Sequence, residues 1–395
     1  MLAAPSYLSV TTVNYQIITP EYPPQFGGVS DYTHQVAVGL AEAGDEVHVW
    51  APAPEDRGQR SEVRHQSSGV MVHWEFGRFW PNDLRRVGKM LDQFPAPRRL
   101  LVQWVPHGFG LRAMNISFCL WLWNRACKGD VVEVMAHECY LPFKSWAIRQ
   151  NIAAVIQRLM TIIILRAAQR VWVSIPAWET RFRPWCFGRH VPFTWLPVPS
   201  NIPVVRDPER IAGVRARFGI NRERVLGHFG TYNQHDRKML RAIFTELLHK
   251  NNGQKIILMG HGSEAMRQEL VESQPCFSGL IHATGTLDAE QLSIHLSACD
   301  VMVQPCQGGV SGRKTTVIAG LAHSRQIVTT TGCLTEAAWS ASKAVVLAAC
   351  DDTTIIALEA NRLLNCGNTR LGQAARQFYE STFALSRTIS NLRST

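Results

Sequence analysis

Residues 299–332 of the chain, CDVMVQPCQGGVSGRKTTVIAGLAHSRQIVTTTG, decide its fold. The first apolar run, residues 300–304, ends before Pro305 and is typical of a short buried strand. A glycine-containing loop follows, and apolar residues then recur at helical spacing over residues 315–322. A further apolar run at residues 326–331 completes a unit of strand, loop, helix and strand, which is the repeating unit of a parallel α/β sheet.

The loop of this unit has the composition of an anion-binding site. It follows the carboxyl end of a strand, where ligands of open α/β sheets bind. Gly309 and Gly312 supply flexible backbone, and a helix that begins at Thr315 presents free N–H groups and the positive end of its dipole. Arg313 and Lys314 add two cations. The loop therefore predicts a site for phosphate or diphosphate, although an ordinary turn with solvated cations has the same composition.

Length and composition indicate a globular protein of two domains. The chain has 395 residues, more than one hydrophobic core usually serves. A hydrophobic content of 46% with 18% charged residues excludes a disordered chain. The ten cysteines are scattered without a CxxC pair, and no closely spaced Cys and His residues predict a zinc site. We therefore expect reduced core cysteines and no bound metal.

The net charge of +10 is unevenly distributed. Residues 93–178 carry ten Lys or Arg residues but only three acids, Asp130, Glu133 and Glu138. This excess suits an anionic membrane surface, nucleic acid or an acidic substrate. Because the chain shows no helix-turn-helix, zinc-finger or RNA-binding aromatic motif, we expect no nucleic-acid partner.

Apolar residues at helical spacing predict a long helix near residues 148–163, with the stripe Ile148, Ile152, Val155, Ile156, Leu159 and Ile163. Cations lie around this stripe, and no acid occurs between Glu138 and Glu179. The stripe suits either the core or an anionic membrane, and we expect the core because the apolar and charged faces are not cleanly separated.

The apolar run at residues 152–165 is interrupted by Arg158 and is shorter than the roughly 20 residues that span a bilayer. The first 13 residues also lack the charged region of a secretory signal. We therefore expect a cytoplasmic protein, either soluble or peripheral on the inner face of the membrane.

Strand patterns recur along both halves of the chain, at residues 15–19, 46–50, 70–76, 100–104, 131–135, 224–229, 255–259 and 281–283. Pro20, Gly27, Gly28 and a helix through Leu40 lead to the sequence AGDEVHV at residues 43–49. This order resembles the opening of glycosyltransferase family 4, where a Pro-rich turn, a Gly-Gly pair and a helix precede GHEVHV. The resemblance covers nearly the whole chain.

The resemblance implies the GT-B fold, an α/β architecture of two Rossmann-like domains facing across a cleft. We expect an acceptor-side domain at residues 1–200, a domain binding the nucleotide sugar at residues 201–375, and a helix at residues 376–395 that returns to the first domain. The implied activity is retaining transfer of a sugar from a nucleotide-diphosphate sugar to the hydroxyl of a polysaccharide, lipid-linked or small-molecule glycan. The nucleotide sugar is a co-substrate, and no cofactor is expected.

The resemblance also implies particular site residues. Gly27 and Gly28 would line the acceptor side. His107 and His137 follow neighbouring strands, and the family commonly places a histidine near the transferred sugar, for which His137 is the better match. A histidine at a strand end is also a common structural feature.

On the donor side, the expected contacts begin with Gly309, Ser311 and Gly312 of the loop, followed by Arg313, Lys314 and Thr315. The other expected contacts are Gly230, Thr231, Arg237, Lys238, Gly260 and Glu336. Glu336 matches the family's TxxGGxxE region. Thr231 stands where the family usually has an arginine, and Arg237 and Lys238 lie close enough in sequence to compensate.

One family motif is altered, because the two carboxylates of the usual Glu-x7-Glu pattern fall on Ser311 and Ala319. Ser311 retains hydrogen-bonding capacity, whereas Ala319 has none. Three hypotheses remain: an active transferase in which Arg313 and Lys314 replace the carboxylates, a transferase-like protein that binds a nucleotide or glycan without turnover, and a sugar-nucleotide epimerase of the same fold. We favour the first, because two adjacent cations at a helix start serve no purpose in a chain without this chemistry.

Overall fold

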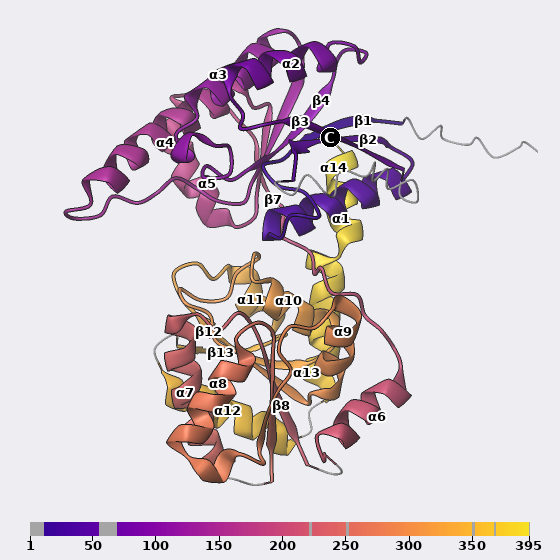
Figure 1. Cartoon of the computed structure of the whole chain (residues 1–395), viewed down its shortest axis with the longest axis vertical. Helices are drawn as coiled ribbons and strands as arrows, with labels where there is room; N and C mark the ends of the chain where they lie inside the picture. The colour runs from indigo at the N-terminus through magenta and orange to yellow at the C-terminus, as the bar shows by residue number, and fades with distance from the viewer. Residues whose placement is uncertain are drawn as a thin grey trace, which may run out of the picture. The chain divides into compact units, whose positions relative to one another are not determined.

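The computed structural model describes residues 12–54, 69–220, 223–249, 253–349, 352–366 and 369–394. The chain divides into two compact units (Figure 1). Unit 1 runs to Leu196 and resumes at Thr388, whereas unit 2 is Pro197–Arg387. Each unit is built around a parallel sheet with helices between its strands, which confirms the predicted α/β architecture of two Rossmann-like units.

Unit 1 contains a seven-stranded sheet in the order β3-β2-β1-β4-β5-β6-β7. The strands are β1 (Asn14–Ile18), β2 (Glu46–Pro52), β3 (Val70–Phe76), β4 (Arg99–Trp104), β5 (Val131–Ala136), β6 (Arg170–Val173) and β7 (Phe193–Trp195). The helices are α1 (Gly28–Glu42), α2 (Pro81–Leu91), α3 (Ile116–Cys127), α4 (Ile148–Ala167) and α5 (Pro176–Phe182), with short 3-10 turns at Leu111–Ala113 and Arg183–Cys186. The strand order reverses between β1 and β4, so the loops after these strands flank the switch point at which ligands of open α/β sheets bind.

Unit 2 contains a six-stranded sheet in the order β10-β9-β8-β11-β12-β13. The strands are β8 (Val225–Phe229), β9 (Lys255–Met259), β10 (Ile281–Ala283), β11 (Val301–Gln304), β12 (Gln326–Thr331) and β13 (Val346–Ala349). The helices are α6 (Pro208–Arg217), α7 (Gln234–His249), α8 (Ser263–Ser273), α9 (Ala289–Ala298), α10 (Thr315–Ala322), α11 (Ala337–Ser342), α12 (Thr353–Cys366) and α13 (Thr369–Phe378), with a 3-10 turn at Pro275–Phe277. Here the order reverses between β8 and β11, so the loop predicted to bind an anion lies at the switch point.

Side chains of the unit 2 strands alternate between two hydrophobic cores, one on each face of the sheet. In β9, Ile257 and Met259 belong to the core that includes α10. Ile256 and Leu258 belong to the core that includes α7 and α12. This burial on both faces explains why the strands read as continuous apolar runs in the sequence.

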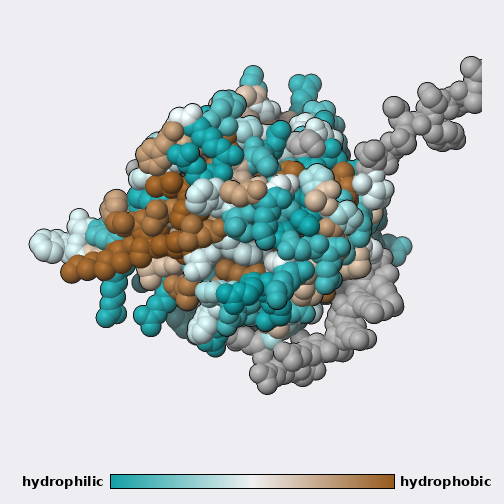
Figure 2. Space-filling model, turned by 90° about the horizontal axis from the view of Figure 1, so that it is seen from above, coloured by the Kyte–Doolittle hydropathy of each residue, from teal (hydrophilic) through white to brown (hydrophobic). Residues whose placement is uncertain are grey.

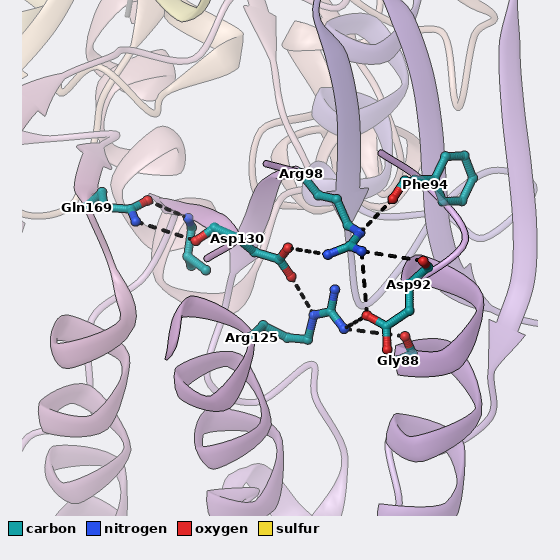
Figure 3. Close-up of polar contacts among 8 residues, drawn as sticks. Gly88, Asp92, Phe94, Arg98, Arg125, Asp130 and Gln169 are labelled. Carbon is teal, nitrogen blue, oxygen red and sulfur yellow. Dashed lines mark hydrogen bonds and ion pairs between the residues drawn. The ribbon is translucent and has the colours of Figure 1, made fainter. Parts of the chain in front are cut away.

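A buried charge network holds the amino edge of the unit 1 sheet to α2 and α3 (Figure 3). Asp130, which has no exposed surface, accepts hydrogen bonds from Arg98 Nη1 at 2.8 Å and from Arg125 Nε at 2.5 Å. Arg125 is itself 1% exposed and also donates to Asp92 Oδ1 at 2.5 Å. The hydrogen bond from Arg125 lowers the pKa of the Asp92 carboxyl. The network lies at the opposite end of the strands from the switch point, so its role is structural.

The last helix, α14 (Leu385–Arg393), belongs from Thr388 onward to unit 1. Arg393 Nε lies 3.0 Å from Asp45 Oδ2. The Leu392 carbonyl accepts hydrogen bonds from Arg99 Nη2 at 2.7 Å and from the Tyr15 hydroxyl at 2.9 Å. These contacts satisfy an end of the helix that has no intrahelical partner. They confirm that the final helix returns to the first domain.

The helix expected at residues 376–395 is interrupted in the structure. A π turn at Tyr379–Phe383 follows α13, and Ala384 is extended with φ −62° and ψ 138°. Phe383 is fully buried against Trp339 and Phe378. Packing of this ring in the unit 2 core explains the break, because helical periodicity carries no information about such a contact.

The expectation that the apolar stripe of α4 faces the core is wrong. Ile148, Ile152, Val155 and Leu159 are all exposed. The buried face of α4 mixes alanine and polar residues with large apolar ones, and consists of Ala154, Gln157, Met160, Thr161, Ile164, Leu165 and Ala167. Gln157 is buried because it makes specific bonds, donating to the Ala113 carbonyl and accepting from the Leu141 N–H.

Candidate functional site

The loop between β11 and α10 is fastened along its length to the segment around β12 and α11. The Cys306 N–H donates to Thr330 Oγ1 at 2.8 Å, and the Val310 N–H donates to the Thr330 carbonyl at 2.7 Å. Further on, the Leu334 N–H donates to the Gly308 carbonyl at 2.9 Å. The loop predicted from its glycines to be flexible is therefore held in a defined conformation.

Glu336 is the strongest single attachment of this loop. Its Oε1 accepts the Gly312 N–H at 2.8 Å, and its Oε2 accepts the Trp339 indole N–H at 2.8 Å. Burial raises the pKa of the Glu336 carboxyl. The Gly312 carbonyl is also bound, by the Val198 N–H at 2.8 Å. In this structure Oε1 of Glu336 holds the loop and Oε2 binds Trp339 of α11, and the predicted contact of Glu336 with a donor stays a prediction.

Glycine is required where the two segments meet. Gly309 has φ +91°, and a Cβ there would lie 2.2 Å from Thr335 Oγ1 and 2.3 Å from the Gly332 nitrogen. A Cβ on Gly332 would lie 2.5 Å from the carbonyl carbon of Gly308. No side chain fits at either contact, so Gly309 has a packing role that the sequence did not indicate.

The end of the loop carries the predicted cations. Helix α10 begins at Thr315, as predicted, with Lys314 at the N-cap and no side-chain cap. The first N–H groups of the helix therefore need partners from outside it. Arg313 and Lys314 are both partly exposed. Within the described ranges, no ion-pair partner is found for the Lys314 ammonium group, which leaves it available to an anion.

The two positions where carboxylates are missing are inaccessible in this structure. Ser311 and Ala319 have no exposed surface. The Ser311 hydroxyl is a buried polar group without a hydrogen-bond partner among the residues that the structure describes. Ala319 lies in the hydrophobic core with Val317 and Leu321. Position 319, where the resemblance to family 4 implied a carboxylate, therefore belongs to the hydrophobic core.

The turns after β8 and β9 approach each other closely at the same edge of the sheet. The Gly230 N–H donates to the Met259 carbonyl at 3.1 Å. A Cβ on Gly260, which has φ +104°, would lie 2.3 Å from the Gly230 carbonyl oxygen. His228 lies beneath this turn, is 4% exposed, and donates from Nδ1 to the Val303 carbonyl at 2.7 Å. The structure thus places Gly230 and Gly260 together, and their contact with a donor stays a prediction.

Burial lowers the pKa of His228 to about 4, whereas a histidine in an unfolded chain titrates near ~6.5. Between these values the unfolded chain binds more protons, so the unfolding free energy falls as pH decreases from ~6.5 toward ~4. We expect His228 to account for roughly 3 kcal/mol of this loss. Urea unfolding of the His228→Asn variant between pH 7.5 and 4.5 should show a shallower pH dependence. The control is His190→Asn, at an exposed position, and an unchanged slope in His228→Asn would contradict the assignment.

The remaining residues predicted to contact the donor differ in whether their side chains are already bound within the protein. The Arg237 guanidinium, on α7, forms an ion pair with the Glu269 carboxylate on α8. Thr231 and Lys238 are exposed. An anion that used Arg237 would compete with Glu269, so Lys238 is the more available of the two cations expected to compensate for Thr231.

In unit 1, the Gly-Gly loop is organised around a residue that the sequence did not single out. Glu21 Oε1 accepts the N–H groups of Val29 and Ser30 at 3.0 Å each, at the start of α1. A Cβ on Gly27 would lie 2.2 Å from the same oxygen, whereas one on Gly28 would meet no atom within 4 Å. Gly27 is thus required for the approach of Glu21. The positive end of α1 is already occupied by this carboxylate.

His107 and His137 lie after β4 and β5, which are neighbours in the sheet. His137 Nε2 donates to Gln103 Oε1 at 2.8 Å, and its ring packs edge-on against Tyr32 with 4.7 Å between centroids. His107 Nδ1 lies 3.3 Å from Glu138 Oε2. The structure therefore brings both histidines to one edge, next to the loop after β1. Gln103, inside a predicted strand, gave no sequence signal of its role.

Among the residues in the described ranges, no group of three or more His, Cys, Asp and Glu side chains is placed to hold a metal ion. The expectation of a metal-independent site stays a prediction, because a nucleotide can itself carry a divalent cation into a site.

Known proteins match this chain in structure. No protein-family model and no curated protein matches it. The structure of a glycosyltransferase from Rickettsia africae has a TM-score of 0.71 at 11% identity, covering 97% of this chain and 98% of that one. A sucrose-phosphate synthase from Thermosynechococcus elongatus has a TM-score of 0.71 at 16% identity, with 96% and 98% covered. Anabaena HepE, solved with UDP, has a TM-score of 0.69 at 13% identity, with 97% and 99% covered.

These matches extend over both units, so the chain has the GT-B fold of glycosyltransferases. Identities of 11–16% show the fold alone. The fold does not assign an activity, which has to be argued from the site.

Proposed function

We propose that this protein is a retaining glycosyltransferase that moves a sugar from a nucleotide-diphosphate sugar to a hydroxyl of a polysaccharide, lipid-linked or small-molecule glycan. One observation carries the proposal. A loop held rigidly at the switch point of unit 2 ends at a helix start beside Arg313 and Lys314. Anabaena HepE, of the same fold, was solved with UDP and with UDP-glucose, so a uridine nucleotide is the first donor to test.

In the proposed reaction, the bond between the sugar C1 and the diphosphate oxygen breaks. Negative charge develops on the departing diphosphate oxygen, and the acceptor oxygen forms a bond to C1 as its proton passes to that diphosphate oxygen. The Lys314 ammonium group and the N–H groups at the start of α10 stabilise this charge, with Arg313 and Lys238 in support. In this proposal these cations take the role that a divalent metal has in other transferases. Retention of configuration is proposed from the family resemblance.

His137 is the proposed sugar contact on the acceptor side. Its Nε2 donates to Gln103, which fixes the orientation of the ring. The Gln103 amide nitrogen is buried without a partner in the part of the chain that the structure describes, and it adds a potential donor beside the imidazole. Gly27 and His107 complete the proposed acceptor-side loops, with Glu21 filling the helix start that a phosphate would otherwise occupy.

The test is a thermal-shift titration with UDP, GDP, ADP and TDP, in EDTA and in Mg²⁺. A nucleotide at about 100 times its Kd should raise the unfolding free energy by roughly 2.7 kcal/mol. Lys314→Ala should weaken binding roughly 10- to 100-fold, because a charge-assisted hydrogen bond is lost. The matched control is Lys89→Ala, which removes an exposed lysine from unit 1 and should bind like the wild type. If no nucleotide stabilises the folded protein, the proposed donor site is wrong.

A second candidate function is nucleotide or glycan binding without turnover. The observation that favours it is the replacement of both motif carboxylates by buried Ser311 and Ala319. Incubation with a stabilising UDP-sugar separates the candidates. A transferase consumes the donor when an acceptor is present, an epimerase converts it without acceptor, and a binding protein leaves it unchanged.

A further inference from the structure

Unit 1 exposes a band of large apolar side chains along α4 and the loop before it. Trp146 is fully exposed, Ile148 is 75% exposed and Phe143 is 58% exposed. Figure 2 shows brown side chains gathered at the left of the view, on the side where Figure 1 places α4. We call this the α4 surface, consisting of Phe143, Lys144, Trp146, Ile148, Arg149, Ile152, Val155 and Leu159. A continuous exposed patch of this kind marks an interaction site.

The segment of chain that carries this surface has charges of one sign only. Residues 139–178 contain five cations, Lys144, Arg149, Arg158, Arg166 and Arg170, and no acid. Lys144 and Arg149 are exposed within the α4 surface itself. Aromatic and aliphatic side chains that alternate with lysine and arginine are the composition of helices that lie in the headgroup region of anionic bilayers.

The loop that carries the aromatic residues is held in place. The Arg158 guanidinium stacks on the rings of Tyr140 and Phe143, at 4.3 and 4.1 Å from their centroids, and donates to the Leu141 carbonyl. The side-chain amide of Asn151 accepts the Lys144 N–H and donates to the Lys144 carbonyl. Phe143 and Trp146 are thus presented next to α4 by specific contacts.

A helix across the membrane is the alternative use of this segment. By length and composition, α4 meets the criteria for a span, with 20 residues and a mean hydropathy of 1.3. The length of the apolar run at residues 152–165 therefore does not exclude a transmembrane helix. However, the opposite face of α4 packs in unit 1, where Gln157 is 1% exposed and bonded to Leu141 and Ala113. Spanning would break these contacts, whereas lying on the surface retains them.

We propose that the α4 surface docks on an anionic lipid bilayer, with α4 parallel to the membrane plane, Phe143 and Trp146 inserted between headgroups, and Lys144 and Arg149 against lipid phosphates. The inference goes beyond the proposed transfer reaction and rests on unit 1 alone. Its consequence is that unit 1 rests at the membrane surface, which suits a lipid-linked acceptor.

The experiment is vesicle co-sedimentation of the full chain. Vesicles of pure phosphatidylcholine are compared with vesicles containing ~30% phosphatidylglycerol at ~0.1 M salt. We expect binding to the anionic vesicles and release at ~1 M salt, where electrostatic attraction is screened. Lys144→Ala with Arg149→Ala should weaken binding roughly 30-fold, from the loss of two cations at the surface. Ile148→Ser with Ile152→Ser should also abolish most binding while leaving the melting temperature unchanged.

Matched controls lie elsewhere on the surface. Ile355 and Leu358 are exposed apolar residues of unit 2, and Arg85 and Lys89 are exposed cations of α2. The pairs Ile355→Ser with Leu358→Ser and Arg85→Ala with Lys89→Ala should bind vesicles like the wild type. The proposed donor site lies in unit 2, so stabilisation by UDP should be the same in all these variants. Failure of the membrane proposal can therefore be distinguished from failure of the donor-site proposal.

Two results would overturn the proposal. One is that the wild type binds neutral and anionic vesicles equally well, or binds neither of them. The other is self-association in sedimentation velocity that disappears in Ile148→Ser with Ile152→Ser, without any vesicle binding, because the α4 surface would then be an interface between two copies of the chain.

Discussion

The Asp130→Ala variant is expected to lose about 3–5 kcal/mol of unfolding free energy, because it leaves a buried charge without its partner. Arg125 is 1% exposed and donates to Asp130 through Nε. After the substitution, its guanidinium would be left with Asp92 at the surface and the Gly88 carbonyl. Arg98 would lose its 2.8 Å bond to the same carboxylate. The large effect comes from depriving the buried Arg125 guanidinium of its buried partner rather than from the attraction that is lost.

Urea unfolding of the purified variant measures this loss. The matched control is Asp92→Ala in the same network, because Asp92 is 44% exposed and water can replace it. We expect Asp92→Ala to cost no more than about 1 kcal/mol, as for exposed ion pairs. Equal losses of unfolding free energy in the two variants would show that the burial of Asp130 does not increase its contribution to stability. Folded Asp130→Ala protein should retain nucleotide stabilisation, since the network is at the far edge of the unit 1 sheet.

Gly309→Ala should be the most disruptive single methyl group at the candidate site. The added Cβ would lie 2.3 Å from the Gly332 nitrogen, a backbone atom that cannot rotate away, and φ +91° strains any residue with a side chain. The segment around Gly332 must therefore move and break the contacts made by Thr330 and Glu336. We expect a loss of roughly 2–4 kcal/mol of unfolding free energy and loss of nucleotide stabilisation.

The control for Gly309→Ala is the same chemical change at Gly213. This glycine lies within α6, and a Cβ there would meet no atom within 4 Å. Alanine is favoured over glycine in a helix, so Gly213→Ala should raise the unfolding free energy by up to about 1 kcal/mol. If Gly309→Ala unfolds like Gly213→Ala and retains nucleotide stabilisation, the contact between the two segments does not organise the site.

The parallel sheets were predictable because their strands are buried on both faces. Strands β3, β9, β10 and β12 and helix α10 have the predicted boundaries. Strands β3, β9 and β12 each end directly before a glycine, and that signal needs no tertiary information. The sequence failed for α4, where hydrophobic periodicity was assigned to the core. The apolar stripe is exposed, and the buried face depends on the hydrogen bonds of Gln157.

The candidate site was predictable in position but not in detail. The switch point follows from the order of strand and loop signals, so Gly230, Gly260 and the cations beside α10 were expected there. Glu21 and Glu336 act through backbone N–H groups that lie eight or more residues away in sequence. No residue pattern marks such a pairing. The same holds for Gln103, whose partner His137 lies 34 residues further along the chain.

The position of α14 has a consequence for synthesis of the chain. Unit 1 is completed only by residues after Thr388, so the whole of unit 2 must leave the ribosome before Leu392 reaches Arg99 and Tyr15. At roughly 5–20 residues per second, the residues of Pro197–Arg387 impose a delay of roughly 10–40 seconds. During that time the Arg99 and Tyr15 side chains lack the Leu392 carbonyl, and Asp45 lacks Arg393. Unit 1 can therefore complete its contacts only after the whole of unit 2 has been synthesised.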